Sequence, residues 1–203
     1  MTNRQTRQSV KDGRNALIQA TVSCLKEFGL HGTSVRRIAE KAGVTPGLLT
    51  HHFSGKEALI IETYRVASLD MLAAFMNRVE QSGDDPTARL YAFIDASFLP
   101  QNMDAGQLKM WLGFWTLVLT DDSAALMHQQ MDQHYQQALA DLLKAACDHQ
   151  NNQLSAESVT RLSVALSALL DGLWLNGCLN PGPEQLELKR RAALEIVSKA
   201  LRP

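Results

Sequence analysis

The sequence predicts an all-α fold of about nine helices, in which an N-terminal helix-turn-helix head precedes a larger helical body. Apolar residues recur with a period near 3.6 residues through almost the whole chain, as in amphipathic helices. The alternation of apolar and polar residues that is typical of half-buried strands is not seen. Glycine, proline and short polar residues recur where the periodic segments begin and end, as helix capping requires.

The composition is that of an ordinary globular protein: 203 residues, of which 45% are hydrophobic and 20% charged. The polar, basic N-terminus lacks the apolar segment of a secretory signal, and no run of about 18 uninterrupted apolar residues occurs. We therefore expect a cytoplasmic protein with no membrane partner. Cys24, Cys147 and Cys178 are far apart and lie in apolar helical patterns, so we expect reduced packing residues rather than disulfides or a zinc site.

The first helix is expected over residues 9–28 and the second over residues 34–42. Gly29 and Gly43 directly follow these two segments. Glycine ends a helix well because it adopts the left-handed turn at little steric cost.

A short third helix is expected to begin at Pro46, since proline at the first helical position loses no hydrogen bond. The hydroxyl of Thr45 is expected to cap this helix. Ser54 and Glu57 have the spacing of a capping box, and a long fourth helix is expected from there to about Gln81. Five more helices are expected over residues 86–100, 105–119, 122–149, 155–179 and 183–201.

Charge is unevenly distributed along the chain. Residues 1–65 carry ten Lys or Arg and five Asp or Glu, a net charge of +5, whereas residues 66–203 carry ten and sixteen, a net charge of −6. A basic head on an acidic body indicates that only the head binds a polyanion; chance clustering of solvated charge is the alternative. We accordingly expect a DNA-binding domain over residues 1–55 and an effector-binding and dimerisation domain over residues 56–203.

The second and third helices, joined by a glycine-containing turn, form a helix-turn-helix whose short helix fits a major groove. Gly47 costs about 1 kcal/mol of helix propensity relative to alanine. Close approach of the backbone to DNA would explain this glycine, and simple tolerance at a helix start is the alternative. Leu49 and Phe53 are expected in the core. The residues expected to contact DNA are Ser34, Val35, Arg36, Thr45, Pro46, Gly47, Leu48, Thr50, His51, His52 and Lys56.

Two adjacent histidines end the short helix. His51 and His52 point about 100° apart, so we do not expect them to share a metal ion. We expect His51 to contact a base or phosphate and His52 to contact a phosphate, with solvation as the alternative. Lys56, in the first turn of the fourth helix, is expected to bind a phosphate together with free backbone N–H groups. Further candidates for DNA contacts are Arg4, Arg7 and Arg14.

The segment TSVRRIAEKAGVTPGLLTHHFSGKEAL, residues 33–59, resembles the DNA-binding motif of the TetR family of transcriptional regulators. It matches the family pattern T-[ST]-V-x-x-I-A-x-x-A-G-V-[ST]-x-G-x-L-Y-x-H-F-x-x-K-E-x-L except at Thr50, where the family has tyrosine. The resemblance implies an all-helical homodimer whose heads bind a palindromic operator and whose bodies supply the dimer surface and an effector pocket. The contact of the family tyrosine does not transfer to Thr50, so the base preference is open.

Two segments of the body, MWLGFW (residues 110–115) and ALSALLDGLWLNGCL (residues 165–179), resemble the bodies of choline-responsive repressors of betaine synthesis. This resemblance implies an effector such as choline or another quaternary ammonium. Aromatic faces attract such cations, and a carboxylate supplies the counter-charge.

Side chains of this chemistry share helix faces in both segments. The expected effector site consists of Trp111, Phe114, Trp115, Asp171 and Trp174. An acid in an apolar helix is costly to bury without a partner, so Asp171 is the most informative of them. Ordinary core packing is the alternative for the rings. We expect Tyr91, His128 and His134 to be packing or surface residues.

Small and apolar residues on the last two helices predict a four-helix interface between two copies, with packing inside one chain as the alternative. They are Leu162, Ser163, Leu166, Ser167, Leu169, Gly172, Leu186, Ala193, Ile196, Val197 and Leu201.

Together these features predict a ligand-responsive repressor that presents two recognition helices about 34–36 Å apart, with the fourth helix linking head and body. The alternative is a small-molecule binding protein with a non-functional head. No nucleophile–base arrangement, metal-ligand cluster or phosphate-binding glycine loop is seen, so we expect neither an enzyme nor a bound cofactor.

Overall fold

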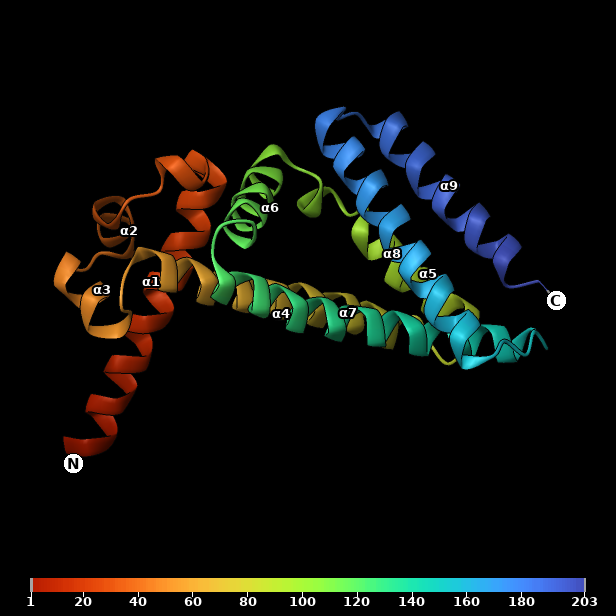
Figure 1. The fold of residues 1–203 in the computed structure, drawn as a ribbon, viewed down its shortest axis with the longest axis horizontal. Coiled ribbons are helices and arrows are strands. Elements are labelled where there is room, and N and C mark those ends of the chain that lie inside the picture. Colours follow the sequence, from red (N-terminus) through yellow and green to blue (C-terminus); the bar gives the residue numbers. More distant parts are fainter. Residues whose placement is uncertain (1, 203) are drawn as a thin grey trace. The chain divides into compact units, whose positions relative to one another are not determined.

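A computed structural model describes residues 2–202 and the side chains of residues 12–202. Over this range the chain forms nine α-helices and one short 3-10 helix, with no strand, and the all-α prediction is confirmed. The elements are α1 (Thr2–Gly32), α2 (Val35–Ala42), α3 (Pro46–His52), α4 (Lys56–Gln81), α5 (Pro86–Ser97), the 3-10 helix η1 (Pro100–Asn102), α6 (Ala105–Val118), α7 (Asp122–His149), α8 (Ala156–Leu179) and α9 (Pro183–Ala200) (Figure 1).

The helices group into two compact units that do not follow the order of the chain. Unit 1 comprises the described residues up to Ser68 together with Gly106–Gln129, and unit 2 comprises Leu69–Ala105 together with the described residues from Gln130 onward. Both α4 and α7 therefore contribute to each unit. Helix α6 belongs with the N-terminal helices although it lies in the middle of the sequence.

Two glycines shape the N-terminal helices: Gly43 ends α2, as predicted, whereas Gly29, which was predicted to end the first helix, lies within α1, which continues to Gly32. Gly29 interrupts α1 with φ 68°, and Gly43 ends α2 with φ 67°, both in the left-handed region that glycine tolerates. The hydroxyl of Ser34 accepts a hydrogen bond from the Arg37 N–H and caps α2. The start of α1 differs from the prediction, because the helix begins at Thr2 rather than near residue 9.

The start of α3 corrects one expectation. Pro46 is the first residue of the helix, as predicted, but the hydroxyl of Thr45 makes no capping hydrogen bond. The first turn is closed instead by the Leu48 N–H, which donates to the carbonyl oxygen of Thr45 at 3.0 Å.

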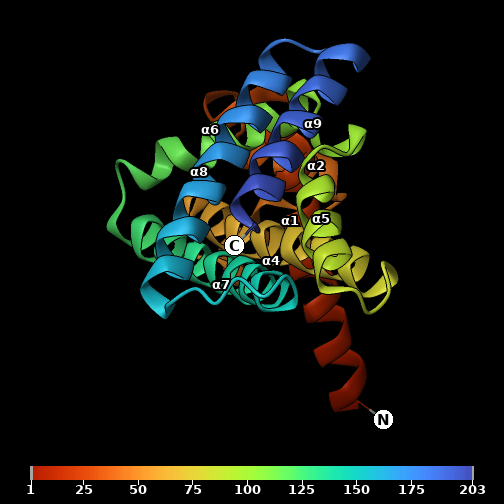
Figure 2. The same ribbon diagram turned by 90° about the vertical axis from the view of Figure 1, so that its right-hand side faces the viewer.

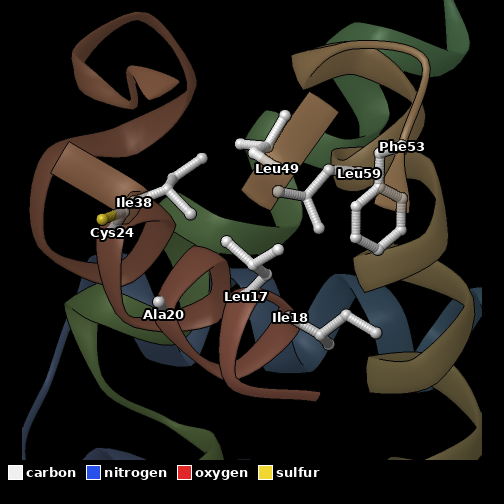
Figure 3. Close-up of a cluster of buried hydrophobic side chains, with 8 residues drawn as sticks. All are labelled: Leu17, Ile18, Ala20, Cys24, Ile38, Leu49, Phe53 and Leu59. Atoms are coloured by element: carbon white, nitrogen blue, oxygen red, sulfur yellow. The ribbon is translucent and has the colours of Figure 1, made fainter. Parts of the chain in front are cut away.

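A hydrophobic core joins the first four helices. Leu17 of α1, Ile38 of α2, Leu49 of α3 and Leu59 of α4 are all fully buried and converge (Figure 3). Leu49 and Phe53 lie in this core, as predicted. Because α2 and α3 each bury only this inner side, their outer side is left for another function.

The later helices agree with the predicted ranges to within one residue, with one exception. Asp85 caps α5 through a 2.7 Å hydrogen bond from the Ala88 N–H, but α5 ends at Ser97 rather than at Pro100. Pro100 instead opens η1, because its fixed φ suits the first position of a new turn. Cys24, Cys147 and Cys178 are free and buried, as expected.

In unit 2, α8 and α9 run side by side as an antiparallel pair, with α5 against α9 (Figure 2). Ser163, Leu166 and Ser167 of α8 are buried, as are Ala193 and Val197 of α9. Packing inside one chain therefore accounts for these five residues, which were candidates for the dimer interface.

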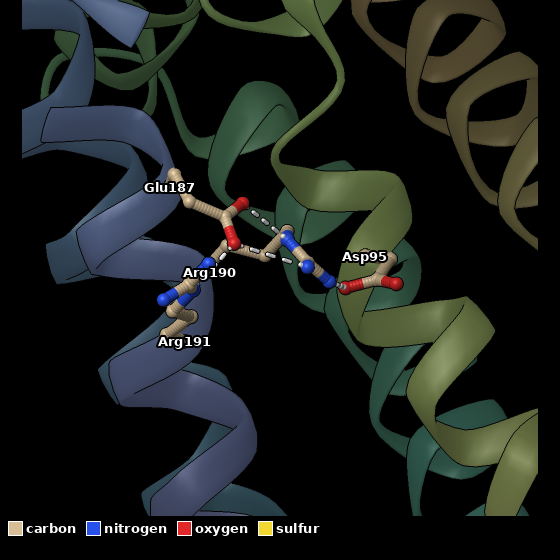
Figure 4. A network of polar contacts seen from close by, with 4 residues as sticks. All are labelled: Asp95, Glu187, Arg190 and Arg191. Carbon is tan, nitrogen blue, oxygen red and sulfur yellow. Dashed lines mark hydrogen bonds and ion pairs between the residues drawn. The ribbon is translucent and has the colours of Figure 1, made fainter. Parts of the chain in front are cut away.

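Arg190 of α9 ties this pair to α5. Its guanidinium donates to Asp95 at 2.9 Å and to Glu187 one turn earlier, also at 2.9 Å, while Arg191 bonds the same glutamate (Figure 4). The hydrogen bonds from Arg190 and Arg191 lower the pKa of Glu187 to about 2.

Candidate nucleic-acid interface and effector residues

The outer side of the helix-turn-helix carries most of the residues predicted to contact DNA. Seven of them are exposed: Ser34, Arg36, Thr45, Pro46, Gly47, Thr50 and His51. The other four, Val35, Leu48, His52 and Lys56, are half-buried. The exposed set is small, polar or basic, which suits a helix that enters a groove.

Gly47 lies at the exposed start of α3, and the protein itself does not require a glycine there. Its φ is not positive, and an added Cβ would meet only Oγ1 of Thr45, at 4.0 Å. Gly13 of α1 is different, because a Cβ there would lie 3.3 Å from Leu48 Cδ2 and 3.4 Å from His52 Nε2. Gly13 thus permits the close packing of α1 and α3, whereas Gly47 faces open space.

The packing on Gly13 changes the interpretation of His52. Its Nε2 atom is buried and has no hydrogen-bond partner among the described residues. Burial, followed by the nearby His51 and Arg14, lowers the pKa of His52. Nε2 is therefore not the atom available to a phosphate, and the predicted contact depends on the rest of the ring.

Arg14, a candidate for DNA contact, is engaged inside the protein. Its guanidinium lies 2.7 Å from Glu62 of α4 and 5.3 Å from the ring centre of Phe53. Arg65 bonds the same carboxylate at 2.7 Å. The hydrogen bonds from Arg65 and then Arg14 lower the pKa of Glu62 to about 2. This network joins α1 to α4 directly behind the recognition helix. The side chains of Arg4 and Arg7 lie outside the described residues.

Lys56 begins α4, as predicted. Its ammonium lies 3.7 Å from Glu57, and both side chains are partly exposed. A pair of this length near the surface is weak, so Lys56 stays available for a phosphate at the N-terminus of α4.

Unit 1 also contains an aromatic cluster around Tyr64 of α4. Phe114 of α6 stacks on Tyr64 with ring centres 4.6 Å apart, and Trp111 contacts both rings edge-on. The hydroxyl of Tyr64 is hydrogen-bonded to Nδ1 of His128 in α7 at 2.6 Å. Of the predicted effector residues, Trp111 and Phe114 thus meet, and Trp115 is half-buried one position further. Phe114 is fully buried and acts as a core residue.

Helix α6 packs against α1 at Gly113, which is buried. A Cβ at Gly113 would lie 3.3 Å from Leu30 Cβ and 3.6 Å from the Leu30 backbone nitrogen. The ammonium of Lys109 donates to the carbonyl oxygen of Glu27 at 3.4 Å. The helix that carries Trp111 and Phe114 therefore also touches the end of α1.

The remaining effector candidates lie in unit 2. The indole N–H of Trp174 donates to the carbonyl oxygen of Asn102 at 2.7 Å. Asp171 is exposed, which corrects the expectation that it is buried. Its charge, after burial, contributes to raising the pKa of Tyr135 in α7, which is also hydrogen-bonded to Ser97. The aromatic cage that would combine both groups of residues stays a prediction.

Three residues of the aromatic cluster and of the surroundings of Asp171 were not predicted from the sequence. Neither Tyr64 nor Tyr135 was a candidate for the effector site, and His128 was expected only as a packing or surface residue. His128 and Tyr135 are seven residues apart on α7, a spacing that places them on one helix face. This spacing was the feature of the sequence that could have indicated both residues. Among the described residues no group of three or more His, Cys, Asp or Glu side chains could hold a metal ion.

Comparison with known proteins identifies a family for each of two regions of the chain. Residues 17–63 match the family described as bacterial regulatory proteins, tetR family, and residues 86–202 match the C-terminal region of BetI-type transcriptional repressors. The HTH-type transcriptional regulator BetI of Stenotrophomonas maltophilia is 33% identical over 181 residues, which cover 89% of this chain and 88% of that protein. BetI of Burkholderia thailandensis is 30% identical over 94% of both chains.

Solved structures show the same fold. A transcriptional regulator from Pseudomonas aeruginosa PAO1 superposes with a TM-score of 0.80 at 31% identity, over 93% of this chain and 89% of that one. A regulator from Saccharomonospora viridis, solved in complex with choline, has a TM-score of 0.78 at 16% identity, over 93% and 96%. The chain belongs to the TetR family of transcriptional regulators with a BetI-type C-terminal region, and it is a DNA-binding regulator rather than an enzyme.

Proposed function

We propose that this regulator is a repressor that binds a palindromic operator as a homodimer in the cytoplasm and responds to a cationic effector. The observation that carries the DNA contact is Gly47. The recognition helix accepts a residue of low helix propensity at an exposed position where no protein atom demands it. Close approach to a partner explains this choice, and the small, polar and basic residues around Gly47 suit DNA.

Gly47→Ala tests this proposal because its two effects have opposite signs. The free protein should gain up to about 1 kcal/mol of stability from the higher helix propensity of alanine. Operator binding should weaken, because the added methyl group occupies the space of the close approach. Thermal unfolding and a gel-shift titration on DNA from upstream of the protein's own gene measure the two effects. A variant that is more stable and binds DNA unchanged would contradict the proposed role of Gly47.

A second pair of substitutions separates a repressor from a binding protein with an inactive head. Lys56→Ala combined with His51→Ala should remove specific operator binding, since both side chains are placed for phosphates or bases. The matched control is Lys144→Ala, which removes an exposed lysine of α7 outside the head. If wild-type protein shows no salt-sensitive DNA binding at all, the alternative function is the correct one.

The homodimer is proposed from the outer side of α8 and α9. Helix α8 is long and apolar enough to cross a membrane, as the core helices of soluble proteins also can be, yet only 33% of its most apolar stretch is buried. Large apolar residues stay exposed on both helices, and they are Val164, Leu179, Leu188 and Ile196. An exposed apolar stripe on a paired helix fits a second copy of the same stripe.

For the effector we propose choline or a related quaternary ammonium. Support comes from the aromatic side chains Trp111, Trp115 and Trp174 and from the exposed carboxylate of Asp171, since ring faces and a carboxylate both attract such a cation. The Saccharomonospora viridis regulator, which shares the fold, was solved with choline.

Thermal unfolding in the presence of choline tests this effector. Choline should raise the melting temperature of the wild-type protein, and Asp171→Asn should reduce that rise. Asp141→Asn, which removes an exposed carboxylate on α7, is the control and should leave it unchanged. A flat response to quaternary ammonium compounds would contradict the cation but leave the DNA-binding function standing.

Helix α4 is the element proposed to transmit the effector signal. Within one turn it carries Glu62, which bonds Arg14 of α1, and Tyr64, which contacts α6 and α7. A displacement of α4 therefore acts on the position of the head, and the effector must bind the two positions with different affinity to change operator occupancy.

A further inference from the structure

The recognition helix lacks the side chains that most often identify bases by hydrogen bonds. Arginine and lysine read guanine in this way, asparagine and glutamine read adenine, and aspartate and glutamate accept from cytosine. The eight residues from Thr45 to His52, TPGLLTHH, include none of these six types. Thymine differs from the other bases by a methyl group in the major groove, which an apolar contact recognises. The composition of α3 therefore favours thymine among the bases that this helix reads.

Thr50 stands where the family pattern has tyrosine, and its hydroxyl is already used. This hydroxyl donates to the carbonyl oxygen of Gly47, one turn earlier in α3, at 2.9 Å. A hydroxyl that donates inside the helix has no hydrogen left for an acceptor on a base. Oγ1 and the methyl group occupy two staggered positions on the same Cβ, so the methyl group points away from the Gly47 carbonyl. Because Thr50 is exposed, it presents this methyl group on the outer side of α3.

Gly47 leaves open space beside Thr50. The two residues are three positions apart and so lie on the same side of the helix. A Cβ added at Gly47 would have one neighbour within 4 Å, Oγ1 of Thr45 at 4.0 Å, so no side-chain atom of Thr50 fills this space. The space admits one methyl group, as the position of the added Cβ shows. We call this space, between Gly47 and the Thr50 methyl group, the Gly47 notch.

We propose that Thr50 is a specificity-determining residue that reads thymine, through contact of its methyl group with the 5-methyl group of a base in the Gly47 notch. The inference rests on the proposed insertion of α3 into a major groove and adds the base that the helix selects there. The contact removes two methyl groups from water, which is favourable. Guanine is disfavoured at the same place, because its two acceptors would face a hydroxyl oxygen that has no hydrogen to offer.

Two other residues of the outer side offer what Thr50 does not. The hydroxyl of Thr45 makes no capping hydrogen bond, and the His51 ring is exposed. Both side chains therefore have donors for phosphates or base acceptors. They add affinity without selecting a methyl group. Substitution of Thr50 should accordingly change the base preference at one position of each half-site and leave DNA binding itself in place.

Replacement of thymine by uracil tests the contact, because uracil lacks only the 5-methyl group. Full-length wild-type protein first selects duplexes from a random-sequence library, and each thymine of the selected site is then replaced in turn. At one thymine position of each half-site, the replacement should lower the affinity about fourfold, the value of one methyl group removed from water. Fluorescence anisotropy titrations measure the affinities.

Two substitutions of Thr50 separate its methyl group from its hydroxyl. Thr50→Ser keeps only the hydroxyl, so it should bind the thymine duplex about fourfold more weakly per half-site and show no further loss with uracil. Thr50→Val keeps the methyl group and should bind, and respond to uracil, as wild type does. A purely structural role of Thr50 would not couple the two methyl groups in this way.

The matched control is Thr160→Ser on α8. Thr160 is an exposed threonine whose hydroxyl likewise donates within its own helix, to the carbonyl oxygen of Ala156 at 3.0 Å. This variant should change neither the affinity nor the response to uracil. Circular dichroism checks that every variant is folded.

The outcomes distinguish failure of this inference from failure of the proposed DNA contact. If Thr50→Ser binds like wild type and Thr50→Val binds weakly, the hydroxyl accepts from a base amino group and the inference is wrong. A uracil effect that is absent in wild type, or equally large in Thr50→Ser, also overturns it while the DNA contact of α3 stands. If wild-type protein selects no sequence and shows no salt-sensitive binding, the contact proposed for α3 is wrong and this inference falls with it.

Discussion

The helix pairs α2–α3 and α8–α9 are built alike but present opposite outer sides. Each pair buries an inner side, with Ile38 and Leu49 in the head and Leu166 and Val197 in the C-terminal pair. The outer side of α2–α3 carries small, polar and basic residues around Gly47, whereas that of α8–α9 carries large aliphatic ones. Inner sides explain the fold, and outer sides indicate the partner: a polyanion for one pair and a second copy for the other.

An inner-side substitution should have the largest effect. Leu49→Ala removes a fully buried side chain from the head core, which costs about 2–5 kcal/mol when the cavity does not collapse. We expect the head to lose stability and operator binding together, in contrast to Gly47→Ala two residues earlier. Chemical denaturation followed by far-UV circular dichroism measures the first loss, and a gel shift measures the second. Unchanged stability would mean that Leu49 is not a core residue.

The outer side of α8–α9 should respond to charge without a loss of folding. Val164→Glu combined with Ile196→Glu should raise the dimer dissociation constant about 100-fold, close to 3 kcal/mol, because each copy brings like charges to the interface. Operator affinity should fall with dimerisation. Sedimentation equilibrium gives the constant, and Gln133→Glu on α7 is the control for added charge. A fully dimeric double variant would show that this stripe faces solvent in the assembly.

The contrast between inner and outer sides also explains what the sequence could predict. Helix ends depend on local chemistry, so Gly43, Pro46 and Asp85 marked them to within a residue. The motif around Gly47 could be predicted as well, because all of its residues lie in one segment of the sequence. The periodicity of a sequence indicates which side of a helix is apolar. It does not indicate whether that side packs inside the same chain or against a second copy. Ser163 and Ser167, expected at the interface, pack inside the chain, and Val164 is exposed instead.

The effector residues were harder to predict because their partners are distant in sequence. Tyr64 and His128 are 64 positions apart and hydrogen-bonded, and neither residue is unusual in its own helix. Asp171 seemed buried because its neighbours are apolar, but those neighbours lie on other sides of α8. Only the packing of α4, α6 and α7 brings the aromatic cluster together.

The ion pairs behind the recognition helix should give a smaller, pH-dependent effect. Glu62→Gln should destabilise the protein by about 1–2 kcal/mol at neutral pH, a value kept low because Arg14 and Arg65 are 40% exposed. Since folding lowers the pKa of Glu62 to about 2, its contribution is complete above about pH 4.5 and is lost as the pH falls toward 2. Urea unfolding between pH 6 and 3 should therefore show a flatter pH dependence in the variant. Parallel curves would exclude this role for Glu62.

Lys56 should produce a change in salt dependence rather than in stability. Lys56→Ala should lower the slope of log affinity against log salt concentration by about 0.9, the value of one phosphate contact. The reduction in affinity should be similar on specific and unrelated DNA. Fluorescence anisotropy titrations at several salt concentrations measure the slope, and Lys144→Ala should retain the wild-type value. An unchanged slope would mean that Lys56 does not contact a phosphate.

The smallest expected effect concerns the pairs that hold α9 to α5. Asp95→Asn removes the inter-helix partner of Arg190, whereas Glu187→Gln removes pairs within α9 alone, with Arg190 and with Arg191. We expect Asp95→Asn to cost about 0.5–1 kcal/mol, since both side chains are about a third exposed, and Glu187→Gln to lower the melting temperature less. Because salt screens such pairs, both differences should shrink in 1 M NaCl. A larger effect for Glu187→Gln would show that α9 depends on pairing along its own length rather than on its contact with α5.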